Sequence, residues 1–316
     1  MSKYKKIDLD KLSTYSVSER KNKVKFDLFG KPLDGDPNLS GYLDSLPKFL
    51  KAEDFRRVVN RIKSAISRDR RIIFMIGAHT LKVGLSPLFI DFIRHYGRLH
   101  FAGNGAVSIH DLEIAFFGAT SEDVLDNLQD GSFGTVRETS EIYSKVLRNA
   151  VENDIGLGQS LGEIIESEDA PYKEYSLAYN CLKNDVPLTI HSAIGTDIIN
   201  QHPDFDGSAC GQASFTDFKI FVNSVRETSG GGVTLNIGSA VIMPEVFLKA
   251  VAVCRNLDRQ FGGFTTANFD MINHYRPAVN VVNRPATLDS EGYNIIGHHE
   301  IMIPLLLACV KSTQRG

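Results

Sequence analysis

Residues 71–118 read RIIFMIGAHTLKVGLSPLFIDFIRHYGRLHFAGNGAVSIHDLEIAFFG. The apolar run at residues 72–76 is too short for a buried helix and is typical of a strand buried on both faces. The small-residue turn at residues 77–80 interrupts it, and apolar residues then recur at helical spacing until Gly97. Pro87 suits the first turn of that helix, because its missing N–H needs no partner there. This half of the stretch predicts a strand, a turn and a helix.

The second half repeats this order, with a short apolar run at residues 99–102, the turn GNGA at residues 103–106, and a second helix. Parallel strands joined by crossover helices end at the same edge of a sheet, so both turns should meet there. Glycines let backbone N–H groups approach a ligand, and helix N-termini favour anions. The pattern indicates a nucleotide or phosphate site, although tight turns also use small residues without any ligand.

Composition restricts the class of protein. The chain has 316 residues, of which 42% are hydrophobic and 23% charged, as in soluble globular proteins. A net charge of −3 provides no broad basic surface for nucleic acid. Apolar runs are too short to span a membrane, and the charged N-terminus does not read as a secretory signal. The four cysteines form no CxxC pair, so we expect reduced thiols, no metal site and a cytoplasmic location.

The chain divides at about residue 50. Residues 1–50 are polar and contain three prolines, which predicts an N-terminal arm with little regular structure. Such an arm either wraps a neighbouring subunit or is a flexible tail. Residues 51–316 predict a single α/β domain with a Rossmann-like, doubly wound, mostly parallel sheet and helices on both faces.

Beyond the opening stretch, the hydrophobic pattern predicts further alternating elements. Helices are predicted at residues 53–68, 120–155 with a loop at 130–134, 156–183 as two helices, 214–227, 244–260 and 299–311. Strands are predicted at residues 186–190, 233–237, 264–269, 279–282 and 293–297.

Four predicted strands end in small or polar turns, at residues 77–80, 103–106, 191–197 and 238–240. In a parallel sheet all four fall on the carboxyl edge, where ligands bind. None of them matches the GxGxxG fingerprint or the GxxxxGK[ST] phosphate loop. The joint pattern therefore predicts a dinucleotide cleft of a less common design.

Seven segments of the sequence resemble the deoxyhypusine synthase family, most closely its bacterial-type deoxyhypusine synthase-like members. They occur in order within roughly residues 53–312 and read IGAHT, GNGAVSIHDLE, VPLTIHSAIGTD, LNIGSAVIMPE, TTANFD, YRPAVNVVNRPA and GHHEIMIPLLLA. The resemblance implies a Rossmann-like fold that binds NAD and forms a homotetramer with sites between subunits. It also implies oxidation of spermidine by NAD, with the aminobutyl group passing through an enzyme lysine to a lysine on a translation factor, or to putrescine in a plant relative.

Carried over position by position, the resemblance implies cofactor contacts at strand ends and at a Thr-Ala pair. These positions are Asn104, Gly105, Ala106, Asp197, Gly238, Thr266 and Ala267. The turn pattern itself adds four more expected cofactor-binding residues, which are His79, Thr80, His110 and Ser239.

Asp270, His298 and His299 are the candidate catalytic residues. Asp270 ends a predicted strand and could hold ribose hydroxyls or an ammonium group, or it could cap a helix. One of the two histidines could act as acid or base, because histidine titrates near neutral pH. If both lay on one strand they would point to opposite faces, so they are a poor pair of metal ligands.

The sequence departs from the family where its nucleophilic lysine should be. The family's Ser-Trp-Gly-Lys segment corresponds to residues 282–285, which read VNRP. Arg284 cannot replace the lysine, because a guanidinium group keeps its proton. His110 replaces a family glutamate, and Met243-Pro244 replaces an active-site Lys-His. Lys82 is a candidate substitute, although a surface charge is the commoner role at such a position.

Two hypotheses of different classes follow. The first is an NAD-dependent transferase that passes an aminoalkyl group between amines without a covalent lysine intermediate. The second is a non-catalytic nucleotide-binding protein that kept the pocket and lost the chemistry. An NAD-dependent deacylase of sirtuin type is disfavoured by the lack of a CxxC…CxxC zinc site.

Overall fold

The computed structural model describes residues 3–21, 25–33, 39–287 and 289–312. Within these residues, six parallel strands form one sheet in the order β3-β2-β1-β4-β5-β6. The strands are β1 (Ile72–Ile76), β2 (Leu99–Asn104), β3 (Leu188–His191), β4 (Val233–Ile237), β5 (Thr265–Asp270) and β6 (Glu291–Ile296). The sheet starts at its centre and grows outward in both directions, which confirms the doubly wound prediction and makes the sheet wholly parallel.

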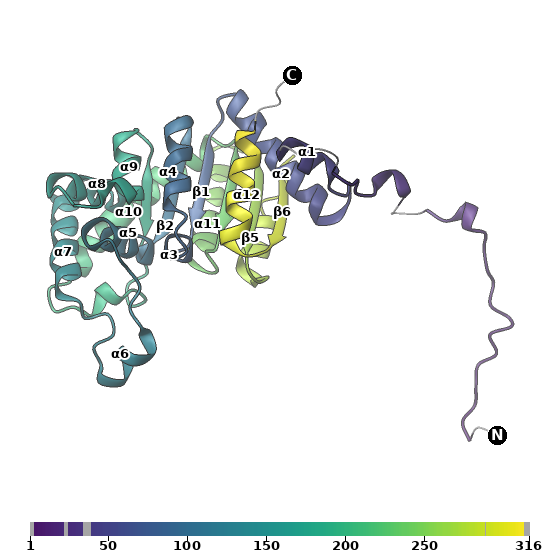
Figure 1. The fold of residues 1–316 in the computed structure, drawn as a ribbon, viewed down its shortest axis with the longest axis horizontal. Helices are drawn as coiled ribbons and strands as arrows, with labels where there is room; N and C mark the ends of the chain where they lie inside the picture. Colours follow the sequence, from purple (N-terminus) through teal and green to yellow (C-terminus); the bar gives the residue numbers. More distant parts are fainter. Residues whose placement is uncertain (1–2, 22–24, 34–38, 288, 313–316) are drawn as a thin grey trace.

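Helices cover both faces of the sheet (Figure 1). One face packs against α2 (Leu50–Ser67), α4 (Ser86–His95) and α12 (His299–Lys311), and the other against α10 (Gly207–Arg226) and α11 (Ile242–Leu257). Strand β1 supplies both cores, because side chains alternate along a strand. Ile72, Phe74 and Ile76 enter the first core, while Ile73 and Met75 enter the second.

The remaining helices lie mainly around the β2 and β3 half of the sheet. They are α3 (His79–Lys82), α5 (Gly105–Phe117), α6 (Val124–Asp130), α7 (Arg137–Glu152), α8 (Leu157–Ser167) and α9 (Leu177–Lys183). Residues 120–155 divide around the predicted loop, and residues 156–183 form two main helices, as the sequence indicated. Figure 1 shows α6 projecting from the body at the lower left.

The strand predicted at residues 279–282 is wrong, because this segment belongs to the π-helix η5 (Pro277–Asn283). Its valines favour a strand locally. However, β5 and β6 are parallel neighbours, so the chain between them must cross back, and a helix does this. The Val281 carbonyl accepts a hydrogen bond from Thr266 Oγ1 at 2.7 Å, which holds η5 against β5.

The N-terminal arm is only partly irregular. Residues 3–21 lead away from the body (Figure 1), and the described arm contains two one-turn 3₁₀ helices, η1 (Val17–Glu19) and η2 (Phe26–Leu28). Residues 39–45 form α1 (Leu39–Ser45), a helix that the sequence did not predict. Arg56 Nη2 donates to the carbonyls of residues 43 and 46, at 3.0 and 2.9 Å, so this end of the arm packs on the domain.

Residues 1–2, 22–24 and 34–38 of the predicted arm lie outside the described residues. In the part of the chain that the structure describes, no helix combines the length and the apolar character that crossing a membrane requires.

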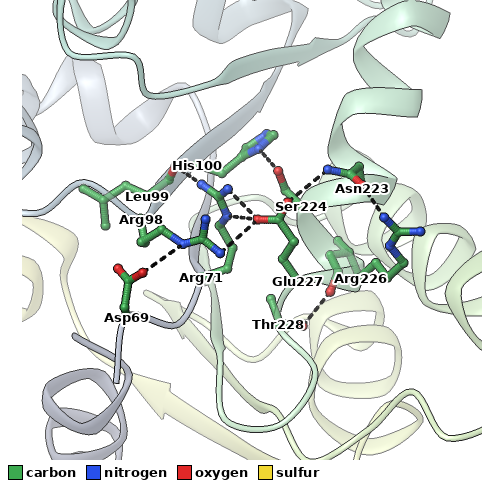
Figure 2. Close-up of polar contacts among 11 residues, drawn as sticks. Asp69, Arg71, Arg98, Leu99, His100, Asn223, Ser224, Arg226, Glu227 and Thr228 are labelled. Carbon is green, nitrogen blue, oxygen red and sulfur yellow. Dashed lines mark hydrogen bonds and ion pairs between the residues drawn. The ribbon is translucent and has the colours of Figure 1, made fainter. Parts of the chain in front are cut away.

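Polar side chains tie the strands to α10 at their amino ends (Figure 2). Arg71 pairs with Glu227 at 2.5 Å and donates to the Leu99 carbonyl at 2.9 Å. His100 Nδ1 lies 2.7 Å from Ser224 Oγ. Burial lowers the pKa of His100 well below its ordinary value, so this imidazole is neutral at pH 7 and needs no counter-ion. The cluster stabilises the sheet at the end opposite to the carboxyl edge.

Candidate functional site

The strand register brings the carboxyl ends of five strands into one row. Ile76 pairs with Gly103 on one side and Ile237 on the other. Gly103 pairs in turn with Ile190, and Ile237 with Phe269. The residues that follow these five form what we call the rim: His191, Asn104, Gly77, Gly238 and Asp270. All four predicted turns lie along it.

His299 and Asp270 form a buried pair at the rim. His299, the first residue of α12, is 1% exposed, and its Nε2 lies 3.3 Å from the Phe269 carbonyl and 4.0 Å from Asp270 Oδ1. Because a carbonyl only accepts, Nε2 carries the hydrogen and Nδ1 carries a lone pair. Nδ1 of His299 and Oδ2 of Asp270 are both buried and without a partner among the described residues. Burial lowers the pKa of His299, so the neutral ring can accept a proton.

His79 adds a third side chain to this pair. It begins α3 directly after β1, and its ring centroid lies 5.5 Å from that of His299. Gly238 lies against the His299 ring, because a Cβ added there would meet His299 Cε1 at 2.7 Å. Four predicted site residues, His79, Gly238, Asp270 and His299, are thus brought together.

The turns after β1 and β4 touch each other at the point where the strand order reverses. Gly77 N donates to the Ile237 carbonyl at 2.8 Å, and a Cβ on Gly77 would lie 2.1 Å from the Gly238 carbonyl oxygen. Gly238 also has a φ of +69°, a conformation that favours glycine. The contact leaves no room for a ligand between these turns, so a ligand at this position, where doubly wound sheets bind theirs, would have to lie over them.

Asp197 occupies the N-terminus of α5. A Cβ on Gly105 would lie 2.0 Å from Asp197 Oδ2, and the Ala106 N–H donates to this carboxylate. Burial raises the pKa of Asp197 to about 6, against the lowering effect of that N–H. Asn104, just before the helix, has a buried Oδ1 with no partner in the described chain. The anion site predicted at this helix thus holds the protein's own carboxylate.

A pocket of about 180 Å³ opens beside Asp197. It joins residues from α3, α5, the residue 119–136 segment and the loop after β3. The lining residues are Lys82, Ala106, Ile109, His110, Glu113, Ser121, Glu122, Val124, Phe133, Val136, Thr196, Asp197 and Ile198. Burial, and secondly the charge of Lys82, lowers the pKa of His110 to about 4, so this ring is neutral at pH 7.

The other predicted site residues lie elsewhere or serve the turns. Thr80 Oγ1 donates to the Gly77 carbonyl at 2.8 Å, and Ser239 Oγ accepts from Met243 N at 3.2 Å. Thr266 and Ala267 are fully buried near the start of β5, about four residues from the rim and bonded within the sheet. His298 faces solvent, with 66% of its side chain exposed, and lies 3.8 Å from Glu300.

The segment that replaces the family's lysine lies away from the rim. Val281 bonds to Thr266, four residues before Asp270, which is roughly 13 Å along a strand. The Pro285 carbonyl accepts from Arg255 Nη2 at 2.9 Å, near the end of α11. Residues 282–285 therefore sit toward the amino ends of the strands, and no side chain there replaces the missing nucleophile.

Sequence reasoning missed Glu113, Thr120 and Thr139, which surround His110. The spacing of His110 and Glu113 by three residues on one helix was a signal for the first of these. Thr120 and Thr139 come from a loop and from α7, so only the fold brings them together. In the described residues, no group of three or more His, Cys, Asp or Glu side chains could hold a metal ion.

No protein-family model matches the sequence, and no curated protein matches it either. Solved structures do match. A candidate deoxyhypusine synthase from Entamoeba histolytica is 12% identical with a TM-score of 0.51, covering 89% of this chain and 95% of its own. A candidate LOR/SDH protein from Methanococcus maripaludis S2 is 15% identical with a TM-score of 0.51, covering 84% and 70%.

AgrE in a complex with ornithine and NAD+ is 12% identical with a TM-score of 0.52. The match covers 84% of this chain but only 34% of AgrE, so this chain spans about a third of that protein. The arginine dihydrolase ArgZ from cyanobacteria is covered to a similar extent, 33%. At these identities the likeness establishes a shared fold, which is that of the deoxyhypusine synthase-like structures.

Proposed function

We propose that this protein is an NAD-dependent transferase that moves an aminoalkyl group from a polyamine such as spermidine to an amine acceptor. The buried His299–Asp270 pair supports this most, because Nδ1 and Oδ2 have no partner among the described residues and lie beside the turns at which the strand order reverses. The fold shared with a candidate deoxyhypusine synthase, and with AgrE in a complex that contains NAD+, supports the choice of cofactor.

The residues along the rim fit NAD, since Asn104, Asp270 and His299 carry buried acceptors that have no partner in the part of the chain that the structure describes. Asn104, Gly105, Ala106, His110 and Asp197 would hold the sugar end of the cofactor, and His79, Thr80, Gly238 and Ser239 would flank the rest. The phosphates would bind away from the N-terminus of α5, because Asp197 fills it. Thr266 and Ala267 take no part, since they lie inside the sheet.

NAD, when bound, would accept a hydride from the carbon next to the substrate nitrogen. The protein's own groups would handle charge and protons. Asp270 would attract an ammonium group, and the lone pair on His299 Nδ1 would take a proton from the reacting amine. The acceptor amine would attack the oxidised donor directly, because residues 282–285 offer no lysine. The old carbon–nitrogen bond would then break, releasing the rest of the donor as an amine, and return of the hydride would reduce the new carbon–nitrogen double bond.

The proposal is tested by incubating the purified protein with NAD and a panel of polyamines and diamines. We expect a transient absorbance of reduced cofactor and a new amine product detected by mass spectrometry. A complete lack of both across the panel would contradict the transferase.

A second candidate is a nucleotide-binding protein without catalysis, which the missing lysine favours. It differs in one outcome: NAD would raise the temperature of unfolding without any turnover. The homotetramer and the cytoplasmic location stay predictions.

A further inference from the structure

A chain of hydrogen bonds links His110 to Thr120, Glu113 and Thr139 at the wall of the pocket. His110 Nδ1 lies 2.6 Å from Thr120 Oγ1. Thr120 Oγ1 in turn donates to Glu113 Oε2. The other carboxylate oxygen, Glu113 Oε1, accepts from Thr139 Oγ1 at 3.2 Å. The carboxylate is thereby held between two threonines that come from different segments.

This chain determines which nitrogen of His110 carries the hydrogen. A carboxylate only accepts hydrogen bonds, so the single hydroxyl hydrogen of Thr120 goes to Glu113. The Thr120 oxygen can then only accept from His110, which places the hydrogen on Nδ1. Nε2 is left with a lone pair.

Nε2 is the nitrogen available to a ligand. His110 lines the pocket and 16% of its side chain is exposed. Nε2 has no hydrogen-bond partner within the described chain, whereas Nδ1 is already used. A ligand group that donates a hydrogen bond to Nε2 would satisfy this lone pair.

The surroundings indicate the chemistry of that donor. Asp197 is a second acceptor in the same pocket, while the carboxylate oxygens of Glu122 are used by Gly134 N and Asn127 Nδ2. The Lys82 ammonium, which is near enough to lower the pKa of His110, adds a hydrogen-bond donor for ligand oxygens. The other walls include the apolar residues Phe133 and Val136. A hydroxylated sugar attached to a flat ring, that is a nucleoside, matches this combination.

We propose that Glu113 and Thr120 are positioning residues that fix His110 as the Nδ1–H tautomer, so that Nε2 selects nucleosides by their sugar hydroxyls. The proposal rests on the nucleotide site proposed above, and it assigns roles to two residues that a shared fold would not identify. The tautomer can be measured without any ligand, so this step is tested independently of the proposed transferase function.

The first test is nitrogen NMR of protein labelled with ¹⁵N-histidine, with His110→Gln identifying the signal. We expect His110 of the wild type to show a protonated Nδ1 and an unprotonated Nε2. Thr120→Ser keeps the hydroxyl and should keep this pattern, while Thr120→Val removes it and should move the hydrogen to Nε2. An Nε2–H tautomer in the wild type would overturn the proposal, as would an unchanged tautomer in a folded Thr120→Val protein.

The second test compares adenosine with 2′,3′-dideoxyadenosine by calorimetry. The wild type and Thr120→Ser should bind adenosine at least about tenfold more tightly, as expected for one lost hydrogen bond to a buried acceptor. Thr120→Val should lower that ratio, because Nε2 would no longer accept a hydrogen bond from a sugar hydroxyl, while Asp197 would still distinguish the two nucleosides. Equal binding of both nucleosides by the wild type, or no binding of either, would overturn the selection step. If neither nucleoside binds but NMR shows the Nδ1–H tautomer, the tautomer step is correct and the proposed nucleotide site is wrong.

Discussion

Replacing Gly77 by alanine is expected to destabilise the protein more than any other single-methyl change on the rim. The added Cβ would lie 2.1 Å from the backbone oxygen of Gly238, which no side-chain rotation can relieve. The ends of β1 and β4 would have to separate at the centre of the sheet. We expect a loss of about 3 kcal/mol, at the upper end for overpacked sites, and a fall of roughly 5 °C in the unfolding midpoint.

Gly97→Ala is the matched control for this variant. Gly97 follows α4, has no heavy atom within 4 Å of an added Cβ, and is not at a positive φ. Its midpoint in heat or urea unfolding should stay close to that of the wild type. Similar midpoints for both variants would mean that the contact between the two central turns is looser than described here.

Replacing His299 by glutamine is expected to lower NAD-dependent amine turnover by about 100-fold or more, the usual loss when a general acid or base is removed. The ring is 1% exposed, and its free Nδ1 lies beside Asp270. Because burial lowers the pKa of His299 below its ordinary 6.5, protonation should reduce kcat/KM only below that pH. Initial rates measured between pH 5 and 8 check both points.

His298→Gln is the control, since this neighbouring histidine faces solvent with 66% of its side chain exposed. Its turnover should equal that of the wild type. If His298→Gln lost activity and His299→Gln did not, the catalytic role would belong to the exposed ring. Loss in both variants would point to the start of α12 as a whole and not to one imidazole.

The sheet could be predicted because its local signals agree with the fold. Residues 72–76 are apolar at every position, as a strand buried on both faces requires, and β1 is indeed buried throughout. The turns after β1, β2, β3 and β4 then had to reach the same edge, because parallel strands with crossover helices leave no other arrangement.

Other features depended on contacts that a sequence pattern does not contain. The valines of η5 favour a strand, and only the parallel pairing of β5 with β6 requires a helix there. Gly105 of the GNGA turn indicated space for a ligand phosphate, yet Asp197 from a distant loop fills that space. Thr120 lies in a loop that shows no periodicity, so its contact with His110 could not be foreseen.

Two of the residues taken from the resemblance do not lie at the rim, because an alignment does not show where along a strand a side chain falls. They are Thr266 and Ala267, and both are buried inside the sheet. His79 and His110 came from the turn pattern, and the structure places one beside His299 and the other in the pocket.

The central claim is that the ends of the strands form one rim on which a dinucleotide lies. A crystal structure of the protein grown with NAD tests it most directly. The account predicts one NAD molecule along the rim, with its nicotinamide end beside His299 and Asp270 and its adenosine sugar beside His110 and Asp197. NAD bound at another surface, or a rim that stays free of it at saturating concentration, would contradict the account.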